Sequence, residues 1–320
     1  MKQNLIRQIS MLIFAICLCL SIKDKCLANA HVQSKGTKDN PYTISTVQDL
    51  LDFAYSVNNG KTYAGEFILQ TNDINLEGVE WKTIGPFDSE YSFMGTYDGD
   101  GHVIENLSVT EGGNNAFFGK LGGTVMNLGI ASGYIEGTCV GSITSHSSNS
   151  NATIINCYNR ATVEGARAGG IADNFNGTIT NCLSECELIG DSTGGIVSYD
   201  AQTIVNDISI GSYNQAAFHH DGIIEYTDKN VNYAAIAEKM NQNIYYSAYI
   251  SGIDYRDVNL WKVSDEKNRI IFSPNKASFE FKYISTYIRV SLIKYFPYLL
   301  LISSACLITI LITKVTSTKI

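Results

Sequence analysis

The sequence lacks the residue patterns of a metal site and is poor in basic residues. It has eight cysteines and five histidines but no CxxC pair and no histidine-rich stretch, which argues against a zinc site. Residues 31–283 hold 15 Lys and Arg against 30 Asp and Glu, a net charge of −15. This excess of negative charge disfavours nucleic acid and anionic polymers as partners, and it favours cations, neutral glycans or proteins. No cofactor is indicated.

What the sequence does contain is a repeat. One short phrase recurs as VIENL (103–107), VMNLG (125–129), IINCY (154–158), ITNCL (179–183) and IVNDI (204–208). A second, glycine-marked phrase alternates with it, as FFGKL (117–121), VGSI (140–143), AGGIA (168–172), TGGIV (193–197) and DGII (221–224). Self-similarity at a period of about 20 to 50 residues is typical of solenoid proteins.

Each repeat has the pattern of strands and turns. β-Branched residues alternate with polar ones before the asparagine, as in residues 178–181 and 203–206. The glycines fall where the chain has to turn, and no repeat contains ten residues of helical periodicity. We therefore predict an all-β fold, a right-handed parallel β-helix (β-solenoid). A leucine-rich repeat also carries a periodic asparagine, but here leucine is sparse and paired glycines replace the helical arc.

The repeated asparagines predict a ladder. Equivalent residues of stacked coils lie about 4.8 Å apart, so their side-chain amides can bond from coil to coil. The predicted ladder consists of Asn106, Asn127, Asn156, Asn181 and Asn206. Cys157 and Cys182 each follow a ladder asparagine and would be near neighbours. In an oxidising compartment they could form a disulfide, or they could be small apolar residues inside the coil.

The two ends of the chain predict export and anchoring. Residues 1–30 have basic residues, an apolar run and the small-x-small site Ala28-Asn29-Ala30, as a secretory signal peptide does. Residues 284–320 contain the uncharged run Tyr295–Thr313, close to the roughly 20 residues needed to cross a bilayer. Neither a lipoprotein box nor an LPxTG sorting signal is present. We expect a single-pass protein of the cell surface with its N-terminal part outside.

Capping segments are expected on both sides of the repeats at 101–224. In residues 31–100, which form an N-terminal cap and the first coils, Ser45 with Gln48 predicts a helical capping box. In residues 225–283, a C-terminal cap and linker, we expect a short helix over 233–243 and a hairpin of 261–263 with 269–272. This C-terminal cap would close the final coil.

Several stretches together resemble a known family. The run NPYTISTVQDLLDFAYSVNNGKTYAGEFILQTNDINL (40–76), then WKTIG (81–85) and FMGTYDGDGHVIENLSV (93–109), is similar to the leader of bacterial surface proteins with GLUG-type repeats. FFGKLGGTVMNLGI (117–130), AGGIADNFNGTITNC (168–182) and TGGIVSYDAQTIVND (193–207) resemble the repeats themselves. The resemblance covers about residues 36–224. It implies an adhesin-like right-handed β-helix on a bacterial envelope and no catalytic residues, although the repeats here are few and irregular.

One stretch could carry chemistry. Asp98, Asp100 and His102 lie in DGDGH, where paired carboxylates beside a histidine could act as general acid and base of a polysaccharide hydrolase or lyase. The same letters suit a tight turn, which is the interpretation we favour. His219-His220-Asp221 could bind a metal or form a loop. A tyrosine group could form a contact patch or line the cap: Tyr245, Tyr246, Tyr249 and Tyr255.

The sequence therefore predicts a non-enzymatic, membrane-anchored surface protein for adhesion or recognition of an extracellular glycan or protein. The alternatives are a membrane-tethered carbohydrate-active enzyme that uses Asp98, Asp100 and His102, and a purely structural spacer.

Overall fold

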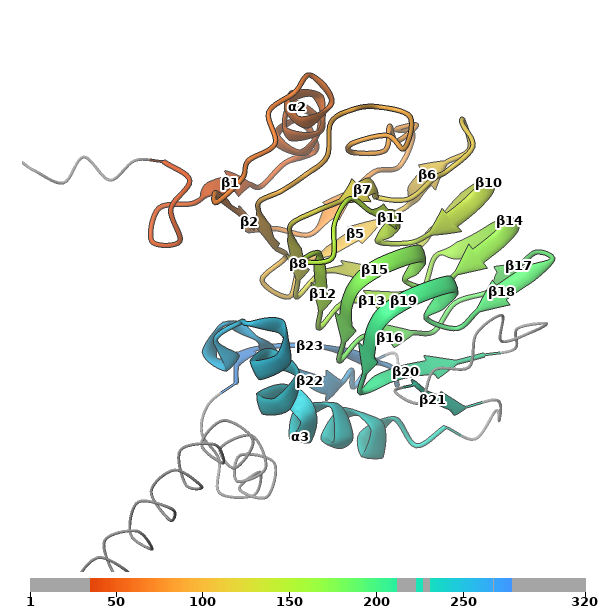
Figure 1. Ribbon diagram of the computed structural model, residues 1–320. Helices are drawn as coiled ribbons and strands as arrows, with labels where there is room; N and C mark the ends of the chain where they lie inside the picture. The colour runs from red at the N-terminus through yellow and green to blue at the C-terminus, as the bar shows by residue number, and fades with distance from the viewer. Residues whose placement is uncertain (1–34, 212–222, 227–230, 267, 278–320) are drawn as a thin grey trace, which may run out of the picture. The chain divides into compact units, whose positions relative to one another are not determined.

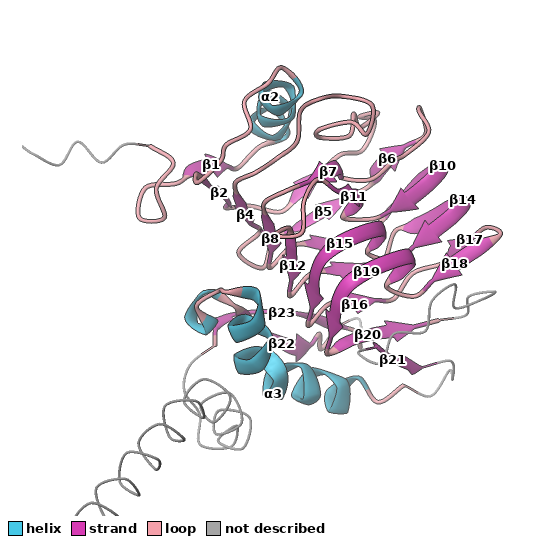
Figure 2. Cartoon of the chain, in the orientation of Figure 1, coloured by secondary structure: helices cyan, strands magenta, loops and turns pink. Residues whose placement is uncertain are grey.

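The computed structural model describes residues 35–211, 223–226, 231–266 and 268–277. From Thr43 onward it is an all-β unit, a β-solenoid of about six coils with few helices (Figures 1 and 2). Residues up to Tyr42 belong to a separate unit, in which the Gly36 N–H donates to the Asn40 carbonyl (2.8 Å). The fold class expected from the repeats is thus confirmed in its coarse form.

Three sheets of parallel strands form the sides of the coils. The first sheet runs in the order β2 (Phe67–Gln70), β4 (Thr96–Asp98), β8 (Thr124–Met126), β12 (Thr153–Ile155), β15 (Ala172–Thr180), β11 (Thr144–Ser147) and β7 (Phe118–Leu121), with β19 (Val197–Val205) also pairing with β15. The second contains β17 (Leu188–Ile189), β14 (Thr162–Gly169), β10 (Gly133–Gly141) and β6 (Leu107–Val109), with β18 (Ser192–Gly194) beside β14. The third runs β21 (Ile223–Tyr226), β20 (Asp207–Ile210), β16 (Leu183–Ser184), β13 (Tyr158–Asn159), β9 (Gly129–Ile130), β5 (Val103–Glu105) and β3 (Ile74–Asn75).

The remaining elements are few. They are β1 (Tyr42–Ile44), the helices α2 (Val47–Asn58) and α3 (Tyr233–Ser251), the 3₁₀ turn η1 (Tyr255–Asp257) and an antiparallel hairpin of β22 (Asn259–Val263) with β23 (Ile270–Lys276). Between residues 59 and 211, all of which the structure describes, there are strands and turns but no helix. This distinguishes the coils from leucine-rich repeats.

Apolar side chains stack inside the coils. Val125, Ile154, Ile179 and Ile204 follow one another in register on β8, β12, β15 and β19, and all four are buried. Because alternate residues of a strand point to opposite faces, one apolar residue in two is enough to fill the interior. Burial of each such side chain stabilises the fold by roughly 1.5–3 kcal/mol.

Repeated asparagines form one corner of the coil. Asn127, Asn156, Asn181 and Asn206 each lie between a strand of the first sheet and a strand of the third, with φ of 52°, 57°, 56° and 64°. This left-handed conformation is one that asparagine tolerates better than most other residues. We call these four residues the asparagine corner.

Asn106 does not belong to this corner, so its predicted place in the ladder is wrong. It lies between β5 and β6, hence between the third and second sheets, and its N–H donates to Ser132 Oγ (2.9 Å). Its side chain donates to Asn75 Oδ1 (2.8 Å). Asn106 has the same left-handed turn geometry (φ 55°), which explains why the same phrase occurs at two different corners.

The segment from α3 to β23 lies along the asparagine corner, and it also packs on the last strands of the solenoid. Ile236 and Met240 of α3 share a buried cluster with Ile208 of β20 (Figure 1). Asn259 of β22 contacts two successive coils, because its N–H donates to Asn127 Oδ1 (2.9 Å) and its carbonyl accepts from Asn156 Nδ2 (3.1 Å). Further along, Asn206 Nδ2 donates to Ser247 Oγ of α3 (3.1 Å). Helix α3 is also longer than expected and ends at Gly252 in a left-handed conformation (φ 68°).

Helix α2 packs on the first coils through one apolar face. Its Phe53 ring lies 5.5 Å from the Phe93 ring, edge to face. The capping box is one residue later than predicted: Thr46 Oγ accepts from the Asp49 N–H (3.1 Å), and Asp49 Oδ2 accepts from the Thr46 N–H (3.0 Å). The prediction from Ser45 and Gln48 was wrong because the first helical residue is Val47.

Candidate functional site

Asp98 and Asp100 are held by a lysine from the other end of the described chain. Lys276 Nζ lies 2.5 Å from Asp100 Oδ1 and 3.9 Å from Asp98 Oδ2. Asp98 Oδ1 also accepts from Asn127 Nδ2 and from the Asp100 N–H, both at 2.8 Å. Burial raises the pKa of Asp98, while the positive charge of Lys276 acts in the opposite direction.

His102 has a different partner. Its Nδ1 lies 3.0 Å from Asp73 Oδ1, which also accepts from the Val103 N–H (3.1 Å). Asp100 itself occupies a left-handed turn position with φ of 49°. The two carboxylates thus share Lys276, whereas the histidine has a separate partner, Asp73.

The asparagine corner carries a shorter ladder than the five residues suggested. Asn156 Nδ2 donates to Asn127 Oδ1, and Asn181 Nδ2 donates to Asn156 Oδ1, both at 2.9 Å. Asn206 bonds to α3 instead. The ladder is therefore made by three neighbouring coils and covered by β22.

Cys157 and Cys182 are buried in adjacent coils as free cysteines. The Cys157 N–H points to Cys182 Sγ at 3.5 Å, and each thiol donates to a backbone carbonyl of its own coil. In this structure both therefore act as small side chains that fill the coil interior.

The other sequence candidates are not gathered into a site. Tyr245 is 5% exposed and its ring lies 4.6 Å from that of Tyr255, so these two tyrosines line the packing of α3 on η1. Tyr249 is exposed on α3. His219-His220-Asp221 lies outside the described residues.

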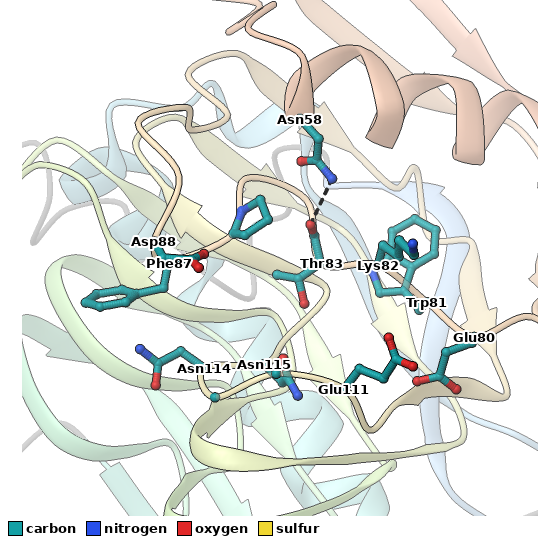
Figure 3. Close-up of a pocket in the computed structure, with 13 residues that line it drawn as sticks. Asn58, Glu80, Trp81, Lys82, Thr83, Phe87, Asp88, Glu111, Asn114 and Asn115 are labelled. Atoms are coloured by element: carbon teal, nitrogen blue, oxygen red, sulfur yellow. Dashed lines mark hydrogen bonds between the residues drawn. The ribbon is translucent and has the colours of Figure 1, made fainter.

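A cleft that the repeat pattern did not predict lies beside the first coils (Figure 3). It has a volume of about 450 Å³, within the roughly 300–1,000 Å³ typical of small-molecule sites. Two irregular segments line it: residues 80–88, between β3 and β4, and residues 111–115, between β6 and β7. Asn58, the last residue of α2, closes one side.

Hydrogen bonds hold the first wall of the cleft in place. Asn58 Nδ2 donates to the Thr83 carbonyl (3.1 Å), and Asn58 Oδ1 accepts from the Gly85 N–H (2.7 Å). Trp81 is 2% exposed, its ring is stacked 5.1 Å from that of Phe117, and its Nε1 donates to the Phe117 carbonyl (3.2 Å). The wall is therefore fixed to helix α2 on one side and to the coil core on the other.

The second wall is fixed as well. Asn115 is buried and its Nδ2 donates to the Glu136 carbonyl (2.5 Å) of β10. Glu80 crosses between the walls, since its Oε1 accepts from both the N–H and the hydroxyl of Thr110 at 3.0 Å. Both walls are thus ordered before any ligand arrives.

Other polar side chains in the cleft do not hold its walls. In the part of the chain that the structure describes, the side chains of Lys82, Asp88, Glu111 and Asn114 make no hydrogen bond or ion pair. Figure 3 shows the carboxyl groups of Glu111 and Glu80 side by side, with Asp88 at the opposite end near Phe87. The cleft therefore has three carboxylates, those of Glu80, Asp88 and Glu111, and one ammonium group, that of Lys82.

Phe87 provides an aromatic surface at the edge of the cleft. It is 45% exposed, and its ring lies 4.3 Å from the ring of His146 on β11. His146 Nε2 lies 3.9 Å from the buried Asp173, and burial lowers the pKa of His146. The imidazole of His146 thus packs against the phenyl ring of Phe87.

The cleft left only a faint signal in the sequence. It is built from the stretches that interrupt the repeat, including Glu111-Gly-Gly-Asn-Asn115, and from Phe87 next to Pro86. Repeat analysis concentrates on positions that recur, and none of these does.

Comparisons with known proteins place the chain in no family. No family model matches it. It is 31% identical over 160 residues to halomucin of Haloquadratum walsbyi, a match that covers 44% of this chain and spans only 2% of halomucin. A crystal structure of a proposed immunoglobulin A1 protease from Bacteroides ovatus aligns with a TM-score of 0.42 at 17% identity, covering 75% of this chain and 94% of that one.

Proposed function

We propose that this protein is a non-enzymatic surface protein that recognises an extracellular glycan or protein. The observation that carries the proposal is the cleft beside the first coils, whose walls are fixed by hydrogen bonds while several polar side chains inside it have no partner among the described residues. Ordered walls with unused polar groups are what a binding site requires, because the cost of ordering is met on folding and not on binding.

The proposal includes export and a membrane anchor. It rests on the signal-like residues 1–30 and on the apolar run Tyr295–Thr313, both of which lie outside the described residues. None of the helices within residues 35–277 that the structure describes is long and apolar enough to cross a bilayer. The resemblance to GLUG-type surface proteins supports the same location.

In this proposal α2 and the C-terminal segment protect the solenoid. Phe53 of α2 covers the aromatic side chains Phe93 and Tyr97 of the first coils. The α3–β23 segment covers the amides of the asparagine corner. A solenoid needs such coverage because its end coils and corners otherwise expose unpaired backbone and apolar surface. A right-handed winding of the coil belongs to the same proposal.

The enzyme alternative draws on one observation, the raised pKa of Asp98, which is a property of many general acids. Against it, Lys276 forms ion pairs with both Asp98 and Asp100, and His102 is paired with Asp73. If a polysaccharide were degraded, turnover that survived Asp100→Asn would show that these residues do not carry it.

A glycan and matrix-protein array tests the proposal. Soluble residues 31–283 are applied with and without calcium, and a defined set of ligands is the expected result. A blank array would contradict recognition of glycans or matrix proteins and would favour the structural spacer.

A further inference from the structure

We infer that the cleft between residues 80–88 and 111–115 binds one unit of an uncharged saccharide. This inference rests on the proposed recognition function and names the ligand class and the site for it. It is argued from three properties of the cleft: its fixed walls, its unused polar groups and its charge.

The first property is that hydrogen bonds hold both walls of the cleft in place. Each wall is tied to an independent element, the first to α2 through Asn58 and the second to β10 through Asn115. Gly112 has φ of +103°, and a Cβ there would lie 3.2 Å from Asn115 Oδ1, so this turn suits glycine. The backbone that lines the cleft is therefore constrained on both sides.

The second property is the chemistry of the side chains that face the space. A sugar ring presents hydroxyl groups around its edge and C–H groups on its face. Glu111 and Asp88 can accept hydrogen bonds from hydroxyl groups, and Asn114 can both donate and accept. Phe87, 45% exposed and backed by His146 at 4.3 Å, offers a flat apolar surface to the C–H face.

The third property is charge. Three carboxylates and one ammonium group leave the cleft with a net charge of −2. This repels uronic, sialic and sulfated sugars, because each brings a further negative charge close to Glu111 and Glu80. A basic peptide would complement the charge. Lys82 would oppose it within the cleft, however, whereas a neutral sugar meets no like charge there.

The experiment uses the full-length chain, purified in detergent. Its binding is measured on a panel of neutral hexose, pentose and N-acetylhexosamine oligosaccharides, with uronate oligosaccharides and oligolysine peptides as competing classes. Phe87→Ala removes the aromatic surface, and Glu111→Gln changes one acceptor without changing shape. Matched controls are Tyr55→Ala, an exposed aromatic residue (72%) on α2, and Asp191→Asn, an exposed carboxylate outside the cleft.

We expect at least one neutral oligosaccharide to bind, with affinity reduced tenfold or more by Phe87→Ala and by Glu111→Gln and unchanged by both controls. Thermal melting verifies that each variant remains folded. Three outcomes overturn the inference: binding that the cleft variants leave unchanged, cleft-dependent binding of oligolysine only, or cleft-dependent binding of uronates. In these cases a ligand is still bound, so recognition itself survives. If the wild-type chain binds no member of any panel or array, the proposed function fails together with the inference.

Discussion

At the scale of single residues, the asparagine corner shows why this residue type recurs. Each of its four positions has a left-handed backbone, which costs an ordinary L-residue roughly 1–2 kcal/mol. Asn127, Asn156 and Asn181 also bond to one another from coil to coil. Glycine would satisfy the backbone and glutamine could supply an amide, but asparagine meets both demands.

Asn156 is the central residue of this ladder and the best test of it. Asn156→Ala leaves Asn181 Nδ2 and the Asn259 carbonyl without the bonds they now make, and Asn127 Oδ1 keeps only its bond from the Asn259 N–H. We expect the free energy of unfolding to fall by about 3–5 kcal/mol, from buried unpaired groups and backbone strain together. Urea unfolding measures the loss.

Two further variants separate the two causes. Asn156→Gly should recover about 1 kcal/mol of the loss, since glycine removes only the backbone strain. Asn206→Ala should cost less than Asn156→Ala, because Asn206 is only partly buried and makes a single side-chain bond, to Ser247. Equal losses at positions 156 and 206 would contradict the ladder.

Asp207 predicts a pH dependence. It is fully buried; its Oδ1 accepts from the Cys182 N–H (2.6 Å), and its Oδ2 has no partner in the described residues. Burial raises its pKa well above the ordinary value of 3.8, with the backbone bond from Cys182 acting the other way. The carboxyl group is therefore protonated in the folded state at a pH where it is ionised in the unfolded state.

Folding then takes up a proton, so this group stabilises the fold most below pH 3.8 and loses that contribution as pH rises toward the raised pKa. The loss is about 1.4 kcal/mol per pH unit within that window. We expect Asp207→Asn to remove it, so that the variant becomes progressively more stable than wild type as pH rises from 4 to 7. Unfolding free energies measured over this range decide the matter; a difference that does not change with pH would show that Asp207 titrates normally.

Asn106 marks the limit of prediction from single residues. The phrase around it matches the repeat, and its backbone has the same left-handed turn. Asn106 nevertheless joins the third sheet to the second, whereas the asparagine corner joins the first sheet to the third. A phrase identifies a turn with an asparagine. It does not identify which corner of the coil that turn occupies.

At the scale of elements, strands were predictable, but the contact of the C-terminal segment with the asparagine corner was not. The strands of the coil follow from alternation of apolar and polar residues, a local signal. By contrast, Asn259 meets Asn127 and Asn156 across more than a hundred residues of chain. Its partners are buried amides of the repeat. The predicted ladder already pairs those amides with one another, so the sequence gives no reason to expect a further partner.

Lys276 fastens this segment to the first coils. Lys276→Met removes the positive charge from Asp100 and from the buried Asp98, which leaves two neighbouring carboxylates without a cation. We expect amide exchange in β22 and β23 to accelerate tenfold or more at neutral pH, including the Asn259 N–H that donates to Asn127. Hydrogen exchange with mass spectrometry measures this.

Lys262→Met is the matched control. Lys262 lies on β22 with its side chain exposed and makes no ion pair in the described structure. Its loss should leave exchange unchanged. Equal acceleration in both variants would mean that the hairpin responds to any loss of charge and not to the Asp98–Lys276–Asp100 contact.

At the scale of the whole molecule, the sequence gives the solenoid class but not the binding site. A period of 20 to 30 residues indicates stacked coils whatever their detail. The cleft, in contrast, is made by two segments that interrupt the period, and by Asn58 from a helix outside it. Sites of this kind depend on which irregular loops the coil brings together, and no repeat-based argument identifies them.

The proposed membrane attachment can be tested directly on the whole chain. We expect the full-length protein to remain with the membrane pellet after alkaline carbonate extraction, because Tyr295–Thr313 would be inserted in the bilayer. A chain that stops at residue 283 should appear in the soluble fraction. Release of the full-length protein would contradict the anchor, whereas retention of the shortened chain would assign attachment to another segment.

The central claim is that the molecule recognises a ligand and does not transform it. The most direct test is to incubate the full-length protein with each glycan that it binds and to analyse the recovered glycan for new reducing ends or unsaturated products. Recognition predicts that every glycan is recovered intact after many multiples of the time needed for binding. Cleavage that is lost in Asp100→Asn would contradict the claim and would assign catalysis to the turn at Asp98 and Asp100.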